Sequence, residues 1–242
     1  MNTEYIIIYN YIYMQILFIR HAESTQNRAN RENTDYDIHN IVLTDNGKKQ
    51  AHRTGKYINK VFGKIDCIYY SPIYRCQETV EIMTKHMKFD GKLILSELLL
   101  EREEHSKLPR DEQNKEKEQI TKEYKKLKID KELNPFIKLE KNIKFTNAIH
   151  KKYKYSPNIK EVYANYIIFL NQIKKLKYNR IVVVAHSKTI VDIINIICGM
   201  NVYNMCLFTN SEKARIQNCS ITCVLYTNKF QLVKAPEDKH LN

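Results

Sequence analysis

The sequence has few glycines and prolines, and it lacks the residue spacings by which proteins usually bind metals. Five Gly and five Pro in 242 residues leave little linker-like composition, so we expect a single domain over residues 1–242. None of the eight histidines forms an HxxxH or HExxH pair, which disfavours a metal enzyme. The six cysteines form no CxxC pair, and they indicate reduced thiols in a cytoplasmic protein.

Long apolar runs are missing as well. A helix that crosses a bilayer needs about 20 apolar residues, and no segment of the sequence reaches that length. Residues 1–13 are apolar, but they lack the basic start and the cleavage site of a signal peptide. We therefore expect a soluble protein without a membrane partner, in which residues 1–13 form an N-terminal extension.

The charge of the chain is unbalanced, because 40 Lys and Arg stand against 27 Asp and Glu, a net charge of +13. This excess favours an anionic partner, either phosphorylated small molecules or nucleic acid, although lysines that serve only solubility would give the same composition. RNP and GXXG motifs are absent, which disfavours nucleic acid. Between about residues 106 and 154, Lys and Glu alternate, and this pattern predicts a charged insert of exposed helix and loop.

Apolar runs of strand length alternate with segments of helical periodicity. Thr44 is suited to cap one predicted helix, and Pro72 is suited to the first position of the next. The alternation predicts an α/β fold, a three-layer sandwich with a mostly parallel central sheet. Strands are predicted at 15–19, 65–70, 180–185 and, followed by a turn, within 93–100; helices at 44–61, 75–86, 158–176 and 189–198; and a hairpin at 221–226 and 230–233.

Two predicted strands end in histidine. His21 follows the strand at 15–19, His186 follows the strand at 180–185, and Arg75 comes shortly after a third strand. Parallel sheets bind ligands at the carboxyl ends of their strands. We therefore expect these three side chains to lie at one edge of the sheet.

Four motifs resemble those of the histidine phosphatase superfamily, the phosphoglycerate mutase-like proteins. They occur in the family's order, each at a predicted strand end or helix start. The resemblance covers about residues 14–105 and 155–226, and it implies the phosphoglycerate mutase-like fold. The motifs are R-H-A-E-S at 20–24, L-T-x-x-G-x-x-Q-A at 43–51, S-P-x-x-R-x-x-x-T at 71–79 and V-A-H-S at 184–187.

The resemblance implies catalytic roles for His21 and His186 and phosphate contacts from Arg20, Asn27, Arg75 and His186. A neutral imidazole at His21 can attack phosphorus and hold it as phosphohistidine. Two guanidinium groups can bind phosphoryl oxygens in bidentate fashion, and His186 can donate to the same oxygens. The simpler interpretation makes the arginines structural ion-pair partners and His186 a packed histidine. No cofactor is expected.

The leaving group and the attacking water need a carboxyl group as acid and base. In the family, an L-x-E-x-x-x-G segment supplies it, which implies Glu101 in this sequence. His105 stands where the family has Gly, and Glu97, Glu103 and Glu104 are the rival candidates.

The predicted function is that of a metal-independent phosphomonoesterase that acts through phosphohistidine on a small phosphorylated substrate. One alternative is a cofactor-dependent phosphoglycerate mutase, which is disfavoured because residues 107–154 lack the Arg-Arg and Pro-rich substrate contacts of those enzymes. The other is an inactive anion- or nucleic-acid-binding module. It is disfavoured because binding alone needs no nucleophile.

Overall fold

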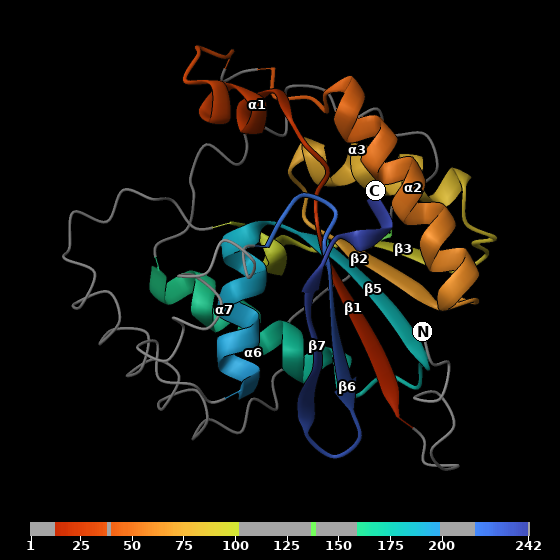
Figure 1. Cartoon of the computed structure of the whole chain (residues 1–242). Coiled ribbons are helices and arrows are strands. Elements are labelled where there is room, and N and C mark those ends of the chain that lie inside the picture. Colours follow the sequence, from red (N-terminus) through yellow and green to blue (C-terminus); the bar gives the residue numbers. More distant parts are fainter. Residues whose placement is uncertain (1–12, 38–39, 102–136, 139–158, 199–215, 242) are drawn as a thin grey trace.

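Strands and helices alternate along the chain in a computed structural model, which describes residues 13–37, 40–101, 137–138, 159–198 and 216–241 (Figure 1). The strands are β1 (Met14–Arg20), β2 (Cys67–Tyr70), β3 (Lys92–Leu95), β4 (Ile137–Lys138), β5 (Arg180–Ala185), β6 (Ile221–Tyr226) and β7 (Phe230–Glu237). The α-helices are α1 (Thr25–Glu32), α2 (Asp45–Val61), α3 (Tyr74–Lys85), α6 (Ile159–Ile173) and α7 (Ser187–Cys198), and short 3-10 helices occur at η2 (Glu97–Leu99) and η5 (Lys239–Leu241).

The described strands form one sheet in the order β4-β3-β2-β5-β1-β6-β7. The four central strands β3, β2, β5 and β1 are parallel, and β4, β6 and β7 are antiparallel at the two edges. The predicted α/β sandwich and its mostly parallel centre are confirmed. β6 and β7 form the predicted hairpin, and β6 pairs with β1, so the hairpin extends the central sheet.

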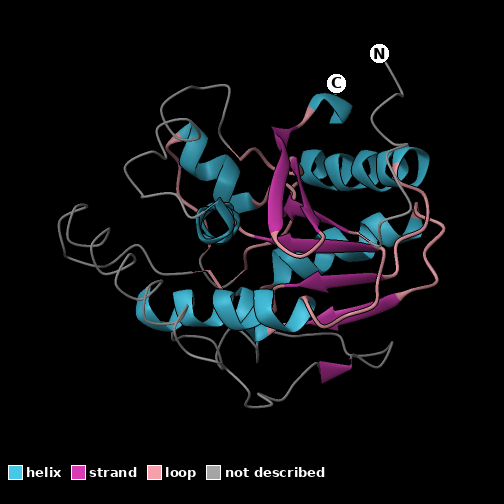
Figure 2. Cartoon of the chain, turned by 90° about the horizontal axis from the view of Figure 1, so that it is seen from below, coloured by secondary structure: helices cyan, strands magenta, loops and turns pink. Residues whose placement is uncertain are grey.

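Side chains of the central strands alternate between two cores, one on each face of the sheet. Phe18 and Val183 pack with residues of α6 and α7. Leu17 and Val182, their chain neighbours, pack with residues of α2 and α3 on the other face. Helices therefore cover both sides of the strands and make three layers, as Figures 1 and 2 show.

The start of α3 differs from the prediction. Pro72 was expected at the first helical position, but it lies in a bend and the helix begins at Tyr74. Ile73 has extended backbone angles (φ −71°, ψ 131°) and is the N-cap, and its N–H donates to the Ser71 hydroxyl at 3.4 Å. Because this bend delays the helix by two residues, Arg75 lies in its first turn.

Two predicted segments fall largely outside the described residues. The N-terminal extension is described only at Tyr13, and the charged insert only at β4, whose Lys138 pairs with Ile94 of β3. The expectation of a single domain stays a prediction. In the described part of the chain, no helix is both long enough and apolar enough to cross a membrane.

The first turn of α2 packs against the loop that follows β1. Thr44 caps the helix as predicted, and its hydroxyl accepts a hydrogen bond from the Gly47 N–H at 3.0 Å. A Cβ on Gly47 would lie 2.0 Å from the carbonyl oxygen of Glu23, so only glycine fits there. The buried Glu23 side chain accepts hydrogen bonds from Thr44 Oγ1 at 2.7 Å and Arg31 Nη1 at 2.6 Å, which ties α1 and α2 to this loop.

Candidate active site

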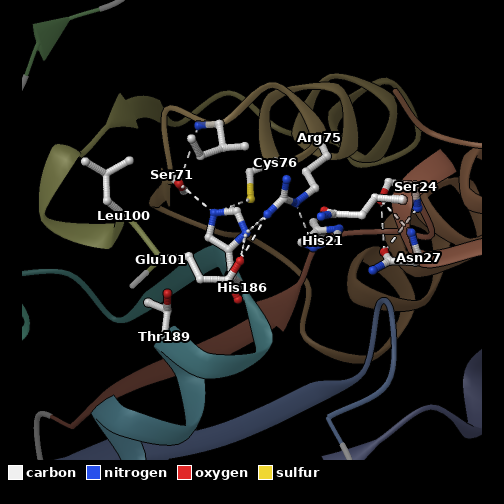
Figure 3. Close-up of polar contacts among 12 residues, drawn as sticks. His21, Ser24, Asn27, Ser71, Arg75, Cys76, Leu100, Glu101, His186 and Thr189 are labelled. Atoms are coloured by element: carbon white, nitrogen blue, oxygen red, sulfur yellow. Dashed lines mark hydrogen bonds and ion pairs between the residues drawn. The ribbon is translucent and has the colours of Figure 1, made fainter. Parts of the chain in front are cut away.

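The carboxyl ends of the parallel strands bring two histidines and an arginine together (Figure 3). His21 follows β1, His186 follows β5, and Arg75 lies in the first turn of α3, which follows β2. The register pairs Arg20 with Ala185, so the two histidines leave neighbouring strands at the same level. Their ring centroids are 5.3 Å apart in an edge-to-face arrangement, and both rings are buried.

The hydrogen bonds of His21 fix which ring nitrogen carries the proton. Nδ1 lies 2.8 Å from the carbonyl oxygen of Ala22. A carbonyl oxygen can only accept, so Nδ1 carries the hydrogen and Nε2 has the lone pair. Burial, together with the positive charge of Arg75 nearby, holds the pKa of His21 well below its usual value. His21 is therefore neutral at pH 7, with a nucleophilic Nε2.

Arg75 lies at the centre of the cluster and contacts its other members. Nε donates to Nε2 of His21 at 3.1 Å. Nη2 is 3.0 Å from a carboxylate oxygen of Glu101 and 3.1 Å from Nδ1 of His186. Arginine can only donate, so the three contacting atoms act as acceptors, and the guanidinium group supplies a fixed positive charge beside the nucleophile.

His186 forms a hydrogen bond with Ser71 on the side of its ring that faces away from Arg75. Nε2 lies 2.9 Å from the Ser71 hydroxyl, while Nδ1 faces Arg75 and lies 3.6 Å from the Glu101 carboxylate. A hydroxyl can either accept from Nε2 or donate to it, so Ser71 permits either neutral tautomer. Burial lowers the pKa of His186 well below its usual value, and Arg75 and Arg20 add to this effect. Because arginine can only donate, Nδ1 accepts from Arg75 in this structure and Nε2 carries the proton. Donation to a phosphoryl oxygen requires the other tautomer, with the proton on Nδ1 and the Ser71 hydroxyl donating to Nε2.

Glu101 supplies the carboxylate of the cluster. It follows η2 and lies beside both Arg75 and His186, with a side chain 26% exposed. Of the rival candidates, Glu97 lies exposed in η2, whereas Glu103 and Glu104 lie outside the described residues. Among the described residues, the carboxylate that lies beside Arg75 and His186 is that of Glu101, the residue that the resemblance implies.

Arg20 and Asn27 lie on the β1 side of the cluster. Nη1 of Arg20 donates to the Ile216 carbonyl at 2.8 Å, and its buried Nε has no hydrogen-bond partner among the described residues. Asn27 is the third residue of α1 and forms a capping box with Ser24. Its Oδ1 accepts from the Ser24 N–H and from Nδ2 of Asn218, so its own NH₂ group is the part that can bind an anion.

Asn218 is a residue of the site to which sequence analysis gave no role. Its Nδ2 donates to the backbone oxygen of His21 at 2.8 Å and to Oδ1 of Asn27 at 3.0 Å. It precedes β6, which runs antiparallel to β1 with Ile221 opposite Ile19. The start of an antiparallel strand lies beside the end of its neighbour, and this pairing would have pointed to Asn218.

The cluster can bind and attack a phosphoryl group. Three donors or cations, on Arg20, Arg75 and Asn27, surround a neutral imidazole that carries a lone pair, with one carboxylate beside it. Charge and donor geometry of this kind suit the equatorial oxygens of a phosphoryl group. Among the described residues, no three His, Cys, Asp or Glu side chains are grouped so that they could hold a metal ion.

A family model of the histidine phosphatase superfamily, branch 1, matches residues 16–239. The chain belongs to this superfamily. The resemblance inferred from the four motifs is confirmed. Members of the superfamily that resemble this chain are phosphatases and mutases.

One relative of this chain is the mitochondrial serine/threonine-protein phosphatase PGAM5 of Xenopus tropicalis. The two are 38% identical over 86 residues, which is 36% of this chain and 28% of PGAM5. The match therefore spans less than a third of that relative's length.

Solved structures share the fold at low identity. A phosphoserine phosphatase from Entamoeba histolytica is 19% identical, with a TM-score of 0.59 over 95% of this chain and 100% of that one. A phosphoglycerate mutase from Bacillus anthracis is 13% identical, with a TM-score of 0.59 over 96% of each chain. An alpha-ribazole phosphatase from Shigella flexneri is 15% identical, with a TM-score of 0.58 over 93% and 97%.

The two buried histidines predict that the protein loses stability in mild acid. Their folded pKa values lie below the usual histidine value, so the unfolded chain takes up protons that the folded chain does not. Stability is full above about pH 6.5 and falls as the pH drops below it, by about 1 kcal/mol per histidine between pH 7.5 and 5.5. Urea unfolding at both pH values measures this loss. Over this pH change, the His21→Gln variant is expected to lose about 1 kcal/mol less free energy of unfolding than the wild type. An equal loss would contradict the lowered pKa of His21.

Proposed function

We propose that this chain is a metal-independent phosphomonoesterase that acts on a small phosphorylated substrate through a phosphohistidine at His21. The observation that carries the proposal is the 2.8 Å contact between Nδ1 of His21 and the Ala22 carbonyl. It leaves a neutral Nε2 lone pair among the guanidinium groups of Arg20 and Arg75. A binding site for an anion needs those guanidiniums, but it does not need an oriented nucleophile.

In the first step, Nε2 of His21 attacks phosphorus while the bond from phosphorus to the ester oxygen breaks. Anionic phosphoryl oxygens are stronger acceptors than an imidazole, so they draw Arg75 away from the His21 lone pair. Arg20 Nε and Asn27 Nδ2 bind the same group from the β1 side. Glu101, in its protonated form, gives its proton to the departing alkoxide, and the substrate leaves as an alcohol.

In the second step, Glu101 takes a proton from water as the water oxygen attacks phosphorus. The bond between phosphorus and Nε2 breaks, inorganic phosphate is released, and His21 returns to its neutral form. The Ala22 carbonyl accepts from Nδ1–H throughout, which stabilises the positive charge on the phosphorylated ring. His186 with its proton on Nδ1 donates to the phosphoryl oxygens as charge develops.

We also propose a cytoplasmic location. The cysteines that the structure describes (Cys67, Cys76, Cys198, Cys219 and Cys223) are free thiols, and all except Cys198 are buried. Burial raises the pKa of Cys76, and the thiol lies 3.6 Å from Nε2 of His186, which supports an inert packing role. Free thiols of this kind suit a reducing compartment.

Turnover of a panel of phosphomonoesters in the presence of a chelator tests the proposed function. The panel contains phosphoserine, 3-phosphoglycerate, 4-nitrophenyl phosphate and a phosphoserine peptide, the last because PGAM5 is named as a protein phosphatase. We expect inorganic phosphate from at least one small member, at a rate that the chelator does not change. Preference for the peptide would overturn the small-substrate class.

The two alternatives give different results in the same assay. A mutase would isomerise 3-phosphoglycerate to 2-phosphoglycerate with little release of phosphate. An inactive anion-binding module would turn over no member of the panel. Either result would overturn the phosphomonoesterase proposal.

A further inference from the structure

The segment that carries Glu101 has little regular structure of its own. Leu99 is fully buried and ends η2, and Leu100 then turns to extended angles (φ −59°, ψ 141°). Glu101 follows outside any helix or strand. The position of its carboxyl group therefore depends on its contact with Arg75 and on what holds the backbone next to it.

A hydroxyl from α6 holds that backbone. The Tyr166 hydroxyl lies 2.8 Å from the carbonyl oxygen of Leu100 and 3.0 Å from Oγ1 of Thr189. The carbonyl can only accept, so Tyr166 donates to it, and Thr189 in turn donates to the oxygen of Tyr166. Tyr166 and Thr189 are both fully buried, so water does not compete for these bonds.

The planarity of the peptide bond carries this hold to Glu101. The Leu100 carbonyl and the Glu101 nitrogen belong to one rigid plane. Restraining the carbonyl oxygen therefore restrains the Cα of Glu101, the atom that carries the side chain. Thr189 lies in the first turn of α7, three residues after His186. The hydrogen bonds from Leu100 through Tyr166 to Thr189 therefore connect the backbone at Glu101 to the start of α7, which directly follows His186.

We propose that Tyr166 is a positioning residue, which holds the Glu101 carboxyl group where it can transfer a proton to the leaving group. The inference rests on the acid and base role proposed for Glu101. Without the hydroxyl, the Leu100 carbonyl loses a buried donor, and the peptide between Leu100 and Glu101 loses a restraint on its orientation. A displacement of about 1 Å at a catalytic group can cost on the order of 100-fold in rate.

The Tyr166→Phe variant tests the proposal through its dependence on the leaving group. An alkyl phosphate releases a strongly basic alkoxide that needs a proton, whereas 4-nitrophenyl phosphate releases a weakly basic phenolate that does not. We expect kcat/KM to fall by about 10- to 100-fold for the preferred alkyl phosphate of the panel and by no more than about 3-fold for 4-nitrophenyl phosphate. The parameter kcat/KM reports the steps up to release of the alcohol, and it does not include hydrolysis of the phosphoenzyme.

Tyr163→Phe is the matched control. Tyr163 is a buried tyrosine of the same helix, and its hydroxyl contacts Asp192 at 3.2 Å. Loss of this hydroxyl removes a buried hydrogen bond of similar kind but leaves the backbone at Leu100 untouched. We expect the control to turn over both substrates at the wild-type ratio.

Glu101→Gln provides the second comparison, since it removes the acid itself. It is expected to show the same leaving-group dependence, and Tyr166→Phe in that background is expected to add less than about 2-fold. Equal losses on both substrates, the same effect from Tyr163→Phe, or full additivity would overturn the positioning role. Failure of the proposed function is distinguishable, because the wild type itself would then turn over no member of the phosphomonoester panel, and the proposal for Tyr166 would fall with it.

Discussion

Replacing His21 by alanine is expected to lower phosphatase turnover by about 10⁴-fold or more, the size of loss seen when a covalent nucleophile is removed. The reason lies in the orientation of its ring, since Nδ1 is committed to the Ala22 carbonyl and only Nε2 faces the arginines. Nδ1 of His186 also faces Arg75, but the Ser71 hydroxyl at Nε2 can accept or donate, so it does not commit that ring to one tautomer as the Ala22 carbonyl commits His21.

The measurement is kcat on the preferred substrate, with inorganic phosphate binding as the control for an intact site. Arg20 and Arg75 remain in the His21→Ala variant, so we expect phosphate to bind within about 10-fold of the wild-type affinity. His52→Ala serves as the matched variant, since His52 is a half-buried histidine of α2 that stacks on His86. It is expected to keep wild-type turnover. Substantial turnover by His21→Ala would contradict the nucleophile assignment.

Replacing Arg75 by methionine is expected to lower kcat/KM by about 10³-fold or more, comparable to the removal of other arginines that stabilise transferring phosphoryl groups. One guanidinium contacts the nucleophile, the carboxylate and the second histidine, each within 3.1 Å. Its loss removes both the positive charge and the geometry that relates these groups. Arg75→Lys is expected to recover less than about a tenth of the activity, because lysine lacks the planar fork.

Stability separates a functional Arg75 from a structural ion-pair partner. Burial is the main cause of the lowered pKa of Arg20, and the charge of Arg75 adds to it, so removal of Arg75 relieves some repulsion between the two cations and offsets the loss of its hydrogen bonds. The free energy of unfolding of Arg75→Met should then differ from the wild type by less than about 1 kcal/mol. A structural ion pair predicts a loss of about 3–5 kcal/mol, and that result in urea unfolding would favour the simpler interpretation.

Most of the fold was predictable because its signals are local. The run from Ile181 to Ala185 is apolar at every position and becomes a central strand, and Thr44 caps α2 as expected. The start of α3 was not, because the Ser71 side chain and the bend at Pro72 decide it. The short helix α1 was missed, since its eight residues bury little and depend on the Ser24 capping box and on Glu23.

The site was predictable where chemistry follows a strand end. His21, His186 and Arg75 come from three separate strand ends and meet as expected. Residues that act through tertiary contacts left no such signal. To predict Asn218 one must know that β6 pairs with β1, and to predict Tyr166 one must know that α6 packs against η2. A tyrosine at helical spacing on an apolar face resembles any core residue until the partner of its hydroxyl is known.

The most direct test of the central claim is to trap the phosphoenzyme. Wild-type protein is mixed with its preferred substrate, quenched in alkali within milliseconds, and digested for mass spectrometry of the peptide that contains His21. The phosphohistidine mechanism predicts one phosphoryl group on His21, stable in alkali and lost in acid, and none in the His21→Ala variant. A phosphoryl group on another residue, or turnover of the substrate with no phosphorylated protein at any time, would contradict it.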